Sequence, residues 1–347
     1  MDPNKLKQFE MVSQEVGQYP DLVQGGGGNT SYKIDDRLMA VKASGYRLDQ
    51  ITTKDGYVIV DYQKIRDYFN TVDLDRDVNF EIESASFMKG CIPEGMNPKD
   101  LRPSIETGFH SFMDRYVIHT HSVYANILCC AVEGEDIANA IFDDSIGMLW
   151  APYVNPGFDL TIELNKAMKQ YMDAKGHAPK VIFMENHGLI VSGDNADECL
   201  KLNERVNSII KSHFGLAKDY PKILLEKIGE NRYKSLTTYL RDTLVEKNIG
   251  MDLFRDISLY PDQLVYLGDN ISFEGNGKIN INSETGEVMY STSEMEALTI
   301  DETFTGFIYV IDNIERLGLT IQTMSEEAIL FIQNMEGEKY RIDLLNK

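Results

Sequence analysis

The first segment with a clear periodic pattern is residues 4–17. Its apolar residues Leu6, Phe9, Val12 and Val16 recur near the spacing of one helical face, so we expect an amphipathic helix there. The tract GGGGNTSYKI follows, and after Asp-Asp-Arg comes the second apolar run LMAVKASG. This pattern predicts two strands that are joined by a tight turn, with a flexible glycine tract in front.

Strand-like and helix-like segments alternate up to about residue 213. The runs GYVIVDYQKI, YVIHTHSV and KVIFMENHGLIVSG are predicted to contain strands, and the last run is interrupted at its histidine and glycine. Helices are expected over residues 103–113, across AVEGEDIANAIF, and over about residues 159–175 and 195–213. Glu106 and His110 are four residues apart in the first of these helices, so they are expected on one face.

The character of the sequence changes near residue 216, and we place a boundary at residues 215–222. The elements expected beyond it are a helical stretch to about residue 248, short strands in DQLVYLG and NISFEGNGKININSETGEVMYS, and helices over 294–317 and 325–338. The sequence therefore predicts a first domain over residues 1–217 and a smaller α+β region of unknown role over residues 218–347.

The composition argues against several kinds of partner. With a net charge of −21, the chain is not expected to bind nucleic acid or an anionic membrane, because both are polyanions that need a basic face. Its N-terminus has no apolar signal core, and no run approaches the roughly 18 apolar residues of a membrane span. The four cysteines form neither a disulfide framework nor a zinc pattern, so we expect a cytoplasmic protein.

The candidate chemistry begins with His119 and His121, two of only six histidines, which occupy alternate positions in an apolar run. Residues i and i+2 of a strand face the same way, so both rings should point to one side. The pair alone could also be two satisfied polar side chains at a barrel mouth or a sheet edge. His187, in ENHGL, lies where a strand meets a glycine and a side chain can project from a sheet edge. Three histidines and one open position form the ligand set of a catalytic zinc.

Glu106 could be a fourth ligand or an acid/base beside the metal. His110 shares its helical face and competes as a ligand, but we favour a role in which its ring orients the Glu106 carboxylate. Zinc is the expected metal, although histidine ligands also suit cobalt or manganese.

Three corners of the chain that are rich in small residues suggest an anion site. The tract GGGGNTS is not a P-loop, because no Gly-Lys-Ser/Thr follows it and a strand comes next. Glycines before a strand can nonetheless turn successive backbone N–H groups toward an anion. Ser44 and Gly45 form a second corner, and Ser104 at a helix start forms a third. The glycine tract alone could be a hinge, but the three corners together suggest a phosphate or carboxylate site.

The ordered series GGGGN, ASG, PSIETGFH, HTH and ENHGL resembles the class II aldolase/adducin family over about residues 5–215. Within that family the likeness is greatest to rhamnulose-1-phosphate aldolases, in particular to the aldolase part of the bifunctional aldolase–dehydrogenase kind. The resemblance implies a three-layer α/β/α fold with a central, largely antiparallel mixed sheet. It also implies a cyclic homotetramer with its active sites at subunit interfaces.

The resemblance also implies an activity and a set of residues. The activity is cleavage of a ketose 1-phosphate, such as rhamnulose or fuculose 1-phosphate, to dihydroxyacetone phosphate and an aldehyde through a metal-stabilised enediolate. The implied residues are the zinc ligands His119, His121 and His187, the acid/base Glu106, and Gly28, Asn29, Ser44, Gly45 and Ser104 around the substrate phosphate.

The chain departs from the fuculose-type pattern in two ways. Ile105 stands where that phosphate site has a second serine, so one hydroxyl contact is missing. The segment between Glu106 and His119 and the loop before APY are also shorter, and no counterpart of the catalytic tyrosine is found there. Tyr124 and Tyr153 are possible replacements.

Other functions stay open at this point. The same family fold hosts epimerases, decarboxylases and a dehydratase, and the histidine triad does not discriminate among them. A non-catalytic adducin-like scaffold is another alternative, although a scaffold has no reason to keep three histidines and Glu106. A sugar-phosphate sensor, with the C-terminal region as its output module, is the third.

Overall fold

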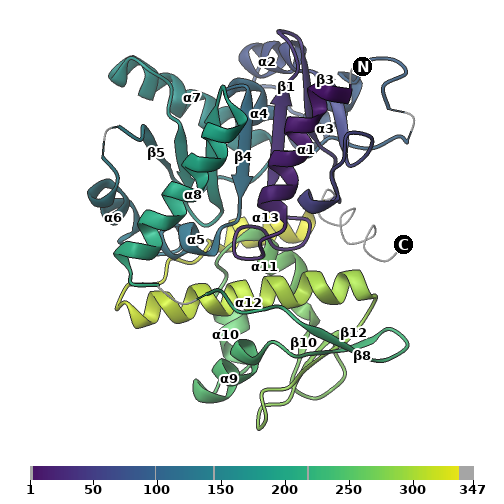
Figure 1. Cartoon of the computed structure of the whole chain (residues 1–347), viewed down its shortest axis with the longest axis vertical. Helices are drawn as coiled ribbons and strands as arrows, with labels where there is room; N and C mark the ends of the chain where they lie inside the picture. The colour runs from purple at the N-terminus through teal and green to yellow at the C-terminus, as the bar shows by residue number, and fades with distance from the viewer. Residues whose placement is uncertain (1–2, 98, 144, 217–218, 336–347) are drawn as a thin grey trace.

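The computed structural model describes residues 3–97, 99–143, 145–216 and 219–335. Within these ranges the strands form two sheets, a seven-stranded sheet in the upper half of Figure 1 and a five-stranded sheet in its lower half. The long helix α12 (Glu294–Arg316) crosses the molecule between them. None of the helices in the described ranges is both long enough and apolar enough to cross a membrane.

The larger sheet has the strand order β3-β2-β1-β4-β7-β6-β5. Its strands are β1 (Asn29–Lys33), β2 (Leu38–Lys42), β3 (Tyr57–Asp61), β4 (Tyr116–Thr120), β5 (Met148–Ala151), β6 (Val181–Met184) and β7 (Gly188–Gly193). Neighbouring strands are antiparallel except β5 and β6, which are parallel. The central strand β4 places His119 opposite Asn29 of β1 and Thr120 opposite Leu189 of β7. This register brings the glycine tract and the ENHGL segment to the end of β4 that carries the histidine pair.

Helices cover both faces of this sheet. One face carries α1 (Pro3–Gly17), α5 (Val123–Cys129) and α8 (Ala196–His213). The other face carries α2 (Tyr62–Thr71), α4 (Thr107–Phe112) and α7 (Phe158–Lys175). The connections contain η1 (Leu48–Gln50), α3 (Phe80–Gly90) and α6 (Gly134–Ile141). In β4, Ile118 joins the apolar cluster on the side of α1 and α8, whereas Val117 joins the cluster on the side of α4 and α7. The predicted three-layer α/β/α fold with a largely antiparallel mixed sheet is confirmed.

The smaller α+β region is also present. Its elements are β8 (Leu225–Gly229), β9 (Arg232–Ser235), α9 (Thr238–Glu246), α10 (Met251–Asp256), α11 (Pro261–Tyr266), η2 (Gly268–Asn270), β10 (Ile271–Ser272), β11 (Ile279–Ile281), β12 (Val288–Ser291), α12 and α13 (Glu326–Asn334), with the strand order β10-β11-β12-β9-β8. Helix α12 is buried along most of its length and packs against α5 as well as against α9 and α11.

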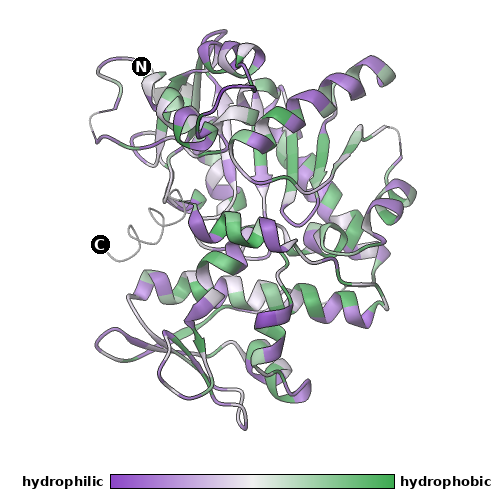
Figure 2. Cartoon of the chain, turned by 180° about the vertical axis from the view of Figure 1, so that it is seen from behind, coloured by the Kyte–Doolittle hydropathy of each residue, from purple (hydrophilic) through white to green (hydrophobic). Residues whose placement is uncertain are grey.

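One apolar cluster runs through both regions of the chain. At their contact, Tyr124 of α5 meets Tyr309 of α12 edge to face, with ring centroids 6.2 Å apart. Figure 2 shows hydrophobic residues in the strands of the larger sheet and along part of α12, with hydrophilic residues on the outer turns of the helices. The two regions therefore share a core.

The helix predicted over residues 103–113 is shorter than expected, because α4 begins only at Thr107. Pro103 and Ser104 instead pair with the backbone at the end of β2, which holds them outside the helix. Glu106 therefore lies at the N-cap position, just before the helix, and not on a helical face.

Two expectations for the C-terminal region are wrong. The stretch after residue 221 begins with the β8–β9 hairpin, in whose turn Asn231 adopts a positive φ of 48°, a conformation that asparagine tolerates better than most residues. The run DQLVYLG forms α11 and the start of η2 instead of a strand. Pro261 is in the first turn of α11, where the fixed φ of proline favours a helix start. Helices α3 and α5 lie in segments for which the pattern predicts no helix.

Candidate metal centre and active site

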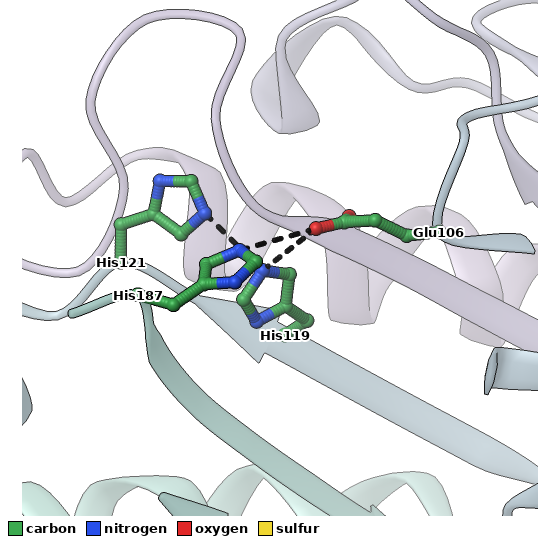
Figure 3. A group of neighbouring side chains, drawn as sticks. All are labelled: Glu106, His119, His121 and His187. Atoms are coloured by element: carbon green, nitrogen blue, oxygen red, sulfur yellow. Dashed lines mark hydrogen bonds and ion pairs between the residues drawn. The ribbon is translucent and has the colours of Figure 1, made fainter. Parts of the chain in front are cut away.

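Four polar side chains meet at one end of β4 (Figure 3). His119 lies in β4, His121 follows the strand directly, His187 lies in the turn between β6 and β7, and Glu106 precedes α4. One ligand atom of each lies within 4.8 Å of those of the others, and all four residues are buried. The structure thus brings together the four residues that the sequence singles out, and their individual roles stay a prediction.

The distances within the cluster show which atoms face one another. Glu106 Oε1 lies 3.1 Å from His119 Nε2 and 3.4 Å from His187 Nε2. His121 Nε2 lies 3.2 Å from His119 Nε2. Three ring nitrogens and one carboxylate oxygen therefore point into the same small volume (Figure 3).

In two of these histidines, the hydrogen-bond partner of the outer ring nitrogen determines which nitrogen carries the proton. His119 Nδ1 lies 3.0 Å from the Leu189 carbonyl oxygen, and His121 Nδ1 lies 2.7 Å from Asp262 Oδ2. A carbonyl and a carboxylate accept hydrogen bonds, so each Nδ1 donates a proton, and each Nε2 faces inward, where its lone pair can bind a cation. Two lone pairs 3.2 Å apart beside a carboxylate repel one another unless a cation lies among them.

The donor set therefore fits a divalent metal. Imidazole nitrogens with a carboxylate oxygen are ligands of catalytic zinc sites and of other first-row metals. His187 is fully buried, and burial lowers its pKa to about 4, so its ring is neutral near pH 7 and can bind a cation. The buried glutamate and the three histidines could thus hold a divalent ion.

Glu106 has an ionised carboxylate. Burial alone would raise its pKa, but the polar contacts of Oε1 with His119 and His187 favour the ionised form and hold the pKa well below its usual range. Its second oxygen, Oε2, accepts a hydrogen bond from Asn29 Nδ2 at 3.3 Å. One oxygen thus faces the histidines, and the other is held by the strand that follows the glycine tract.

Close backbone contacts explain the glycines around the cluster. A Cβ on Gly188 would lie 2.4 Å from the Thr120 carbonyl oxygen, so only glycine lets β7 come this near to the end of β4. Gly28 has a φ of +63°, and a Cβ there would lie 2.8 Å from the His119 carbonyl oxygen. These two glycines therefore allow β7 and the glycine tract to pack directly against β4.

A small cavity of about 50 Å³ opens beside the cluster. Its lining includes Glu106, His121 and His187 together with four of the five predicted phosphate residues, namely Gly28, Ser44, Gly45 and Ser104. Asn29, the fifth, contacts Glu106. Ile105 also lines the cavity, at the position where the fuculose-type pattern has a second serine.

Two lining residues were missed by the sequence reasoning. Lys42 is buried, and its Nζ donates hydrogen bonds to the carbonyl oxygens of Gly26 (2.7 Å) and Tyr46 (2.9 Å), which places a cation beside the three small-residue corners. Its position directly before ASG was an available signal. Asp262 contacts His121 from 141 residues further along the chain, so no local pattern could have indicated it.

The remaining candidate residues lie as follows. His110 Nδ1 shares a hydrogen bond of 2.8 Å with Ser31 Oγ, and burial lowers the pKa of its ring to about 3, so the ring is neutral. Its role in orienting Glu106 stays a prediction. Tyr124 donates a hydrogen bond to Asp21, and neither Tyr124 nor Tyr153 is among the described residues that line the cavity.

Residues 12–213 match the family model described as the Class II Aldolase and Adducin N-terminal domain. The chain belongs to the class II aldolase/adducin family. A curated relative of this class II aldolase/adducin protein is the uncharacterized oxidoreductase YuxG of Bacillus subtilis (strain 168). It is 28% identical over 228 residues, which cover 59% of this chain and 30% of the relative, so the chain spans less than a third of that relative's length.

Several solved structures are similar to this family member. The N-terminal class II aldolase domain of a conserved protein from Thermoplasma acidophilum is 24% identical, covers 60% of this chain and 92% of its own, and has a TM-score of 0.49. YgbL of Klebsiella pneumoniae, a putative aldolase/epimerase/decarboxylase, is 20% identical, with coverages of 63% and 92% and a TM-score of 0.43. An L-fuculose-1-phosphate aldolase from Thermus thermophilus is 14% identical, with coverages of 62% and 95% and a TM-score of 0.39.

Proposed function

We propose that this class II aldolase/adducin protein is a metal-dependent aldolase that cleaves a ketose 1-phosphate to dihydroxyacetone phosphate and an aldehyde. The observation that carries the proposal is the cluster of three inward-facing imidazoles and an ionised carboxylate beside a cavity lined by small residues. Family membership supports an enzyme of this class. Rhamnulose and fuculose 1-phosphate are the candidate substrates.

In this proposal His119, His121 and His187 hold the metal, with zinc as the first candidate. When bound, the ion supplies Lewis-acid polarisation of substrate oxygens. Glu106 is the acid/base: as the C–C bond breaks, its carboxylate takes the proton of the substrate hydroxyl that becomes the aldehyde oxygen, and it then returns this proton to the carbon left with the electron pair. Asn29 holds one carboxylate oxygen while the other faces the reacting centre.

The anion end of the substrate belongs at the small-residue corners in this proposal. Gly28, Ser44, Gly45 and Ser104 line that part of the cavity, and Gly28 opens it with a left-handed φ of +63°. Lys42 adds a positive charge there, which compensates for the hydroxyl that is missing at Ile105. A phosphate therefore fits this end better than a neutral group does.

The experiment that tests the proposal is a coupled assay for dihydroxyacetone phosphate. L-Rhamnulose 1-phosphate and L-fuculose 1-phosphate are supplied separately, with and without a chelator, to protein whose metal content has been measured. Release that the chelator abolishes supports both the reaction class and the metal. If metal-loaded protein releases nothing from either sugar, the aldolase proposal fails for these substrates.

A second candidate is an epimerase, decarboxylase or dehydratase that uses the same site. The observation that favours it is that no tyrosine is found among the described residues that line the cavity, so this wall offers no phenol to protonate an aldehyde oxygen. NMR after incubation separates these reactions, since epimerisation of a sugar phosphate retains every carbon, whereas decarboxylation requires a sugar-acid phosphate as the substrate and releases carbon dioxide. Retention of unchanged ligand with measurable affinity would instead favour the sensor.

The homotetramer is part of the proposal because it rests on the family resemblance. Light scattering after size-exclusion chromatography measures the mass of the assembly, and a monomeric active enzyme would contradict the tetramer.

A further inference from the structure

Three segments that build the candidate site are each held by the C-terminal region, residues 219–335. These segments are the end of β4 with His121, the turn with His187, and the glycine tract. The contacts come from α11, from α12, and from two residues outside these helices, Leu259 and Gln322. This arrangement cannot be read from the family model, whose match ends at residue 213.

The contact to His121 is the most direct. Asp262, in the first turn of α11, is 2% exposed and places Oδ2 2.7 Å from His121 Nδ1. Pro261 and Asp262 also form part of the cavity wall. The carboxylate therefore touches the outer nitrogen of a ring whose inner nitrogen faces the cluster.

The turn that carries His187 is anchored by its neighbour Asn186. This asparagine has a positive φ of 49°, is buried, and donates hydrogen bonds of 2.8 Å from Nδ2 to the carbonyl oxygens of Leu259 and Gln322. Both acceptors belong to the C-terminal region. A strained backbone at this position is thus stabilised from outside the aldolase-like part of the chain.

The glycine tract is anchored by Glu302 of α12. Its Oε2 accepts a hydrogen bond of 2.7 Å from the Gly25 backbone N–H. The same carboxylate makes two bonds of 2.9 Å to the guanidinium of Arg47, and both side chains are buried. Gly27 completes the contact, because a Cβ there would lie 2.5 Å from Asp262 Oδ2 and 2.8 Å from His121 Nδ1.

We propose that the C-terminal region contributes to the metal site and that Asp262 is a positioning residue for the ligand His121. The inference rests on the proposed metal site. Asp262 accepts the Nδ1 proton, which leaves the Nε2 lone pair directed at the ion, and its negative charge makes the imidazole a stronger ligand. Loss of such an outer contact weakens metal binding about 10–100-fold in general.

The test is zinc affinity, measured by competition with a chromophoric chelator on the full chain. Asp262→Ala is expected to bind zinc about 10–100-fold more weakly than wild type. Asp262→Asn keeps an oxygen that accepts the same hydrogen bond without the charge, so its loss should be smaller, and Asp262→Glu should restore part of the affinity. The matched control is Asp269→Asn, an exposed aspartate of the same region, which should bind zinc as wild type does.

Two further measurements separate positioning from a general loss of structure. With cobalt in place of zinc, the visible absorption bands should shift in Asp262→Ala and stay unchanged in Asp269→Asn. Thermal unfolding with the metal removed should show that Asp262→Asn, which is nearly isosteric, is folded. Wild-type zinc affinity and an unchanged cobalt spectrum in both Asp262→Asn and Asp262→Ala would overturn the inference.

His121→Ala distinguishes this inference from the proposed function. If His121→Ala binds zinc as tightly as wild type does, the proposed metal site itself is wrong. If His121→Ala loses zinc while the Asp262 variants keep it, the metal site stands and only the role of Asp262 falls.

Discussion

At the scale of single residues, the site depends on where protons and charges are held. Leu189 and Asp262 accept the Nδ1 protons of His119 and His121, and Asn29 holds one oxygen of Glu106. These partners are ordinary hydrogen-bonding groups, but each one decides which atom of a functional side chain faces inward. The chemistry of the cluster therefore follows from its outer contacts as much as from the four side chains themselves.

The first prediction concerns Glu106. Glu106→Gln keeps the shape of the side chain and its acceptor oxygen but removes its capacity to carry a proton. Turnover should fall about 10²–10⁴-fold, the usual contribution of a positioned general acid or base. Bound zinc, measured by elemental analysis, should stay at the wild-type level because three imidazoles remain. Loss of zinc together with activity would make Glu106 a ligand.

The second prediction concerns Glu81, whose partly buried carboxyl accepts a hydrogen bond from the Phe158 N–H at the start of α7. Burial raises its pKa from 4.5 to about 7. Below pH 4.5 the group is protonated in both the folded and the unfolded chain. Between 4.5 and 7 only the unfolded chain releases the proton, so the free energy of unfolding falls as pH rises through this window.

Glu81→Gln should remove that dependence. The variant should gain about 1–2 kcal/mol in the free energy of unfolding over wild type at pH 8, a figure reduced for the partial exposure of the group, and little at pH 4. Urea unfolding at the two pH values measures the difference. An equal change at both would show that the carboxyl does not titrate in this window.

At the scale of elements, the glycine tract packs closely against the site because its residues have no side chains. Gly27 lies against the Asp262–His121 pair, and Gly28 lies against the backbone of His119. A side chain at either position would enter space that another functional group already fills. The tract is therefore a packing requirement of the site and not a free hinge.

The third prediction follows from that contact. Gly27→Ala should weaken zinc binding about tenfold or more, because the added methyl would lie 2.5 Å from Asp262 Oδ2 and push the pair apart. Gly90→Ala is the matched control, since no atom lies within 4 Å of its added Cβ. The two variants are compared by chelator competition, and equal affinities would contradict the role given to the tract.

Elements with regular patterns could be predicted from the sequence, and those held by distant contacts could not. The spacing of His119 and His121 and the glycine after His187 indicated the cluster directly. Helix α4 starts late because its first residues pair with β2, which the local pattern of residues 103–113 cannot reveal. DQLVYLG is apolar and short enough to suit a strand or a helix, and only its contacts to α12 and α13 decide.

At the scale of the whole molecule, the two regions share one apolar cluster and a buried ion pair. Arg47 belongs to the first region and Glu302 to the second, and neither carboxylate oxygen of Glu302 lacks a guanidinium partner. A buried pair of this kind adds little by itself, but removal of one partner leaves an uncompensated charge.

The fourth prediction uses that pair. Arg47→Met should lower the free energy of unfolding by about 3–5 kcal/mol, whereas Arg47→Met combined with Glu302→Gln should recover part of the loss. As the control, Arg255→Met, which breaks an exposed pair with Asp252, should change the free energy of unfolding by less than about 1 kcal/mol. Denaturant unfolding should show one transition for both regions, and two separate transitions would contradict a shared core.

The position of Asp262 has a consequence for protein engineering. A chimera that joins residues 3–216 to a foreign C-terminal partner would inherit all three imidazoles but lose the carboxylate behind His121 and the two carbonyls that hold Asn186. Under the proposed assignment of the metal site, such a hybrid would carry every motif by which the family is recognised but would bind the metal only weakly. The smallest unit that can be transplanted is therefore larger than the domain that the family model matches, and it extends through Gln322.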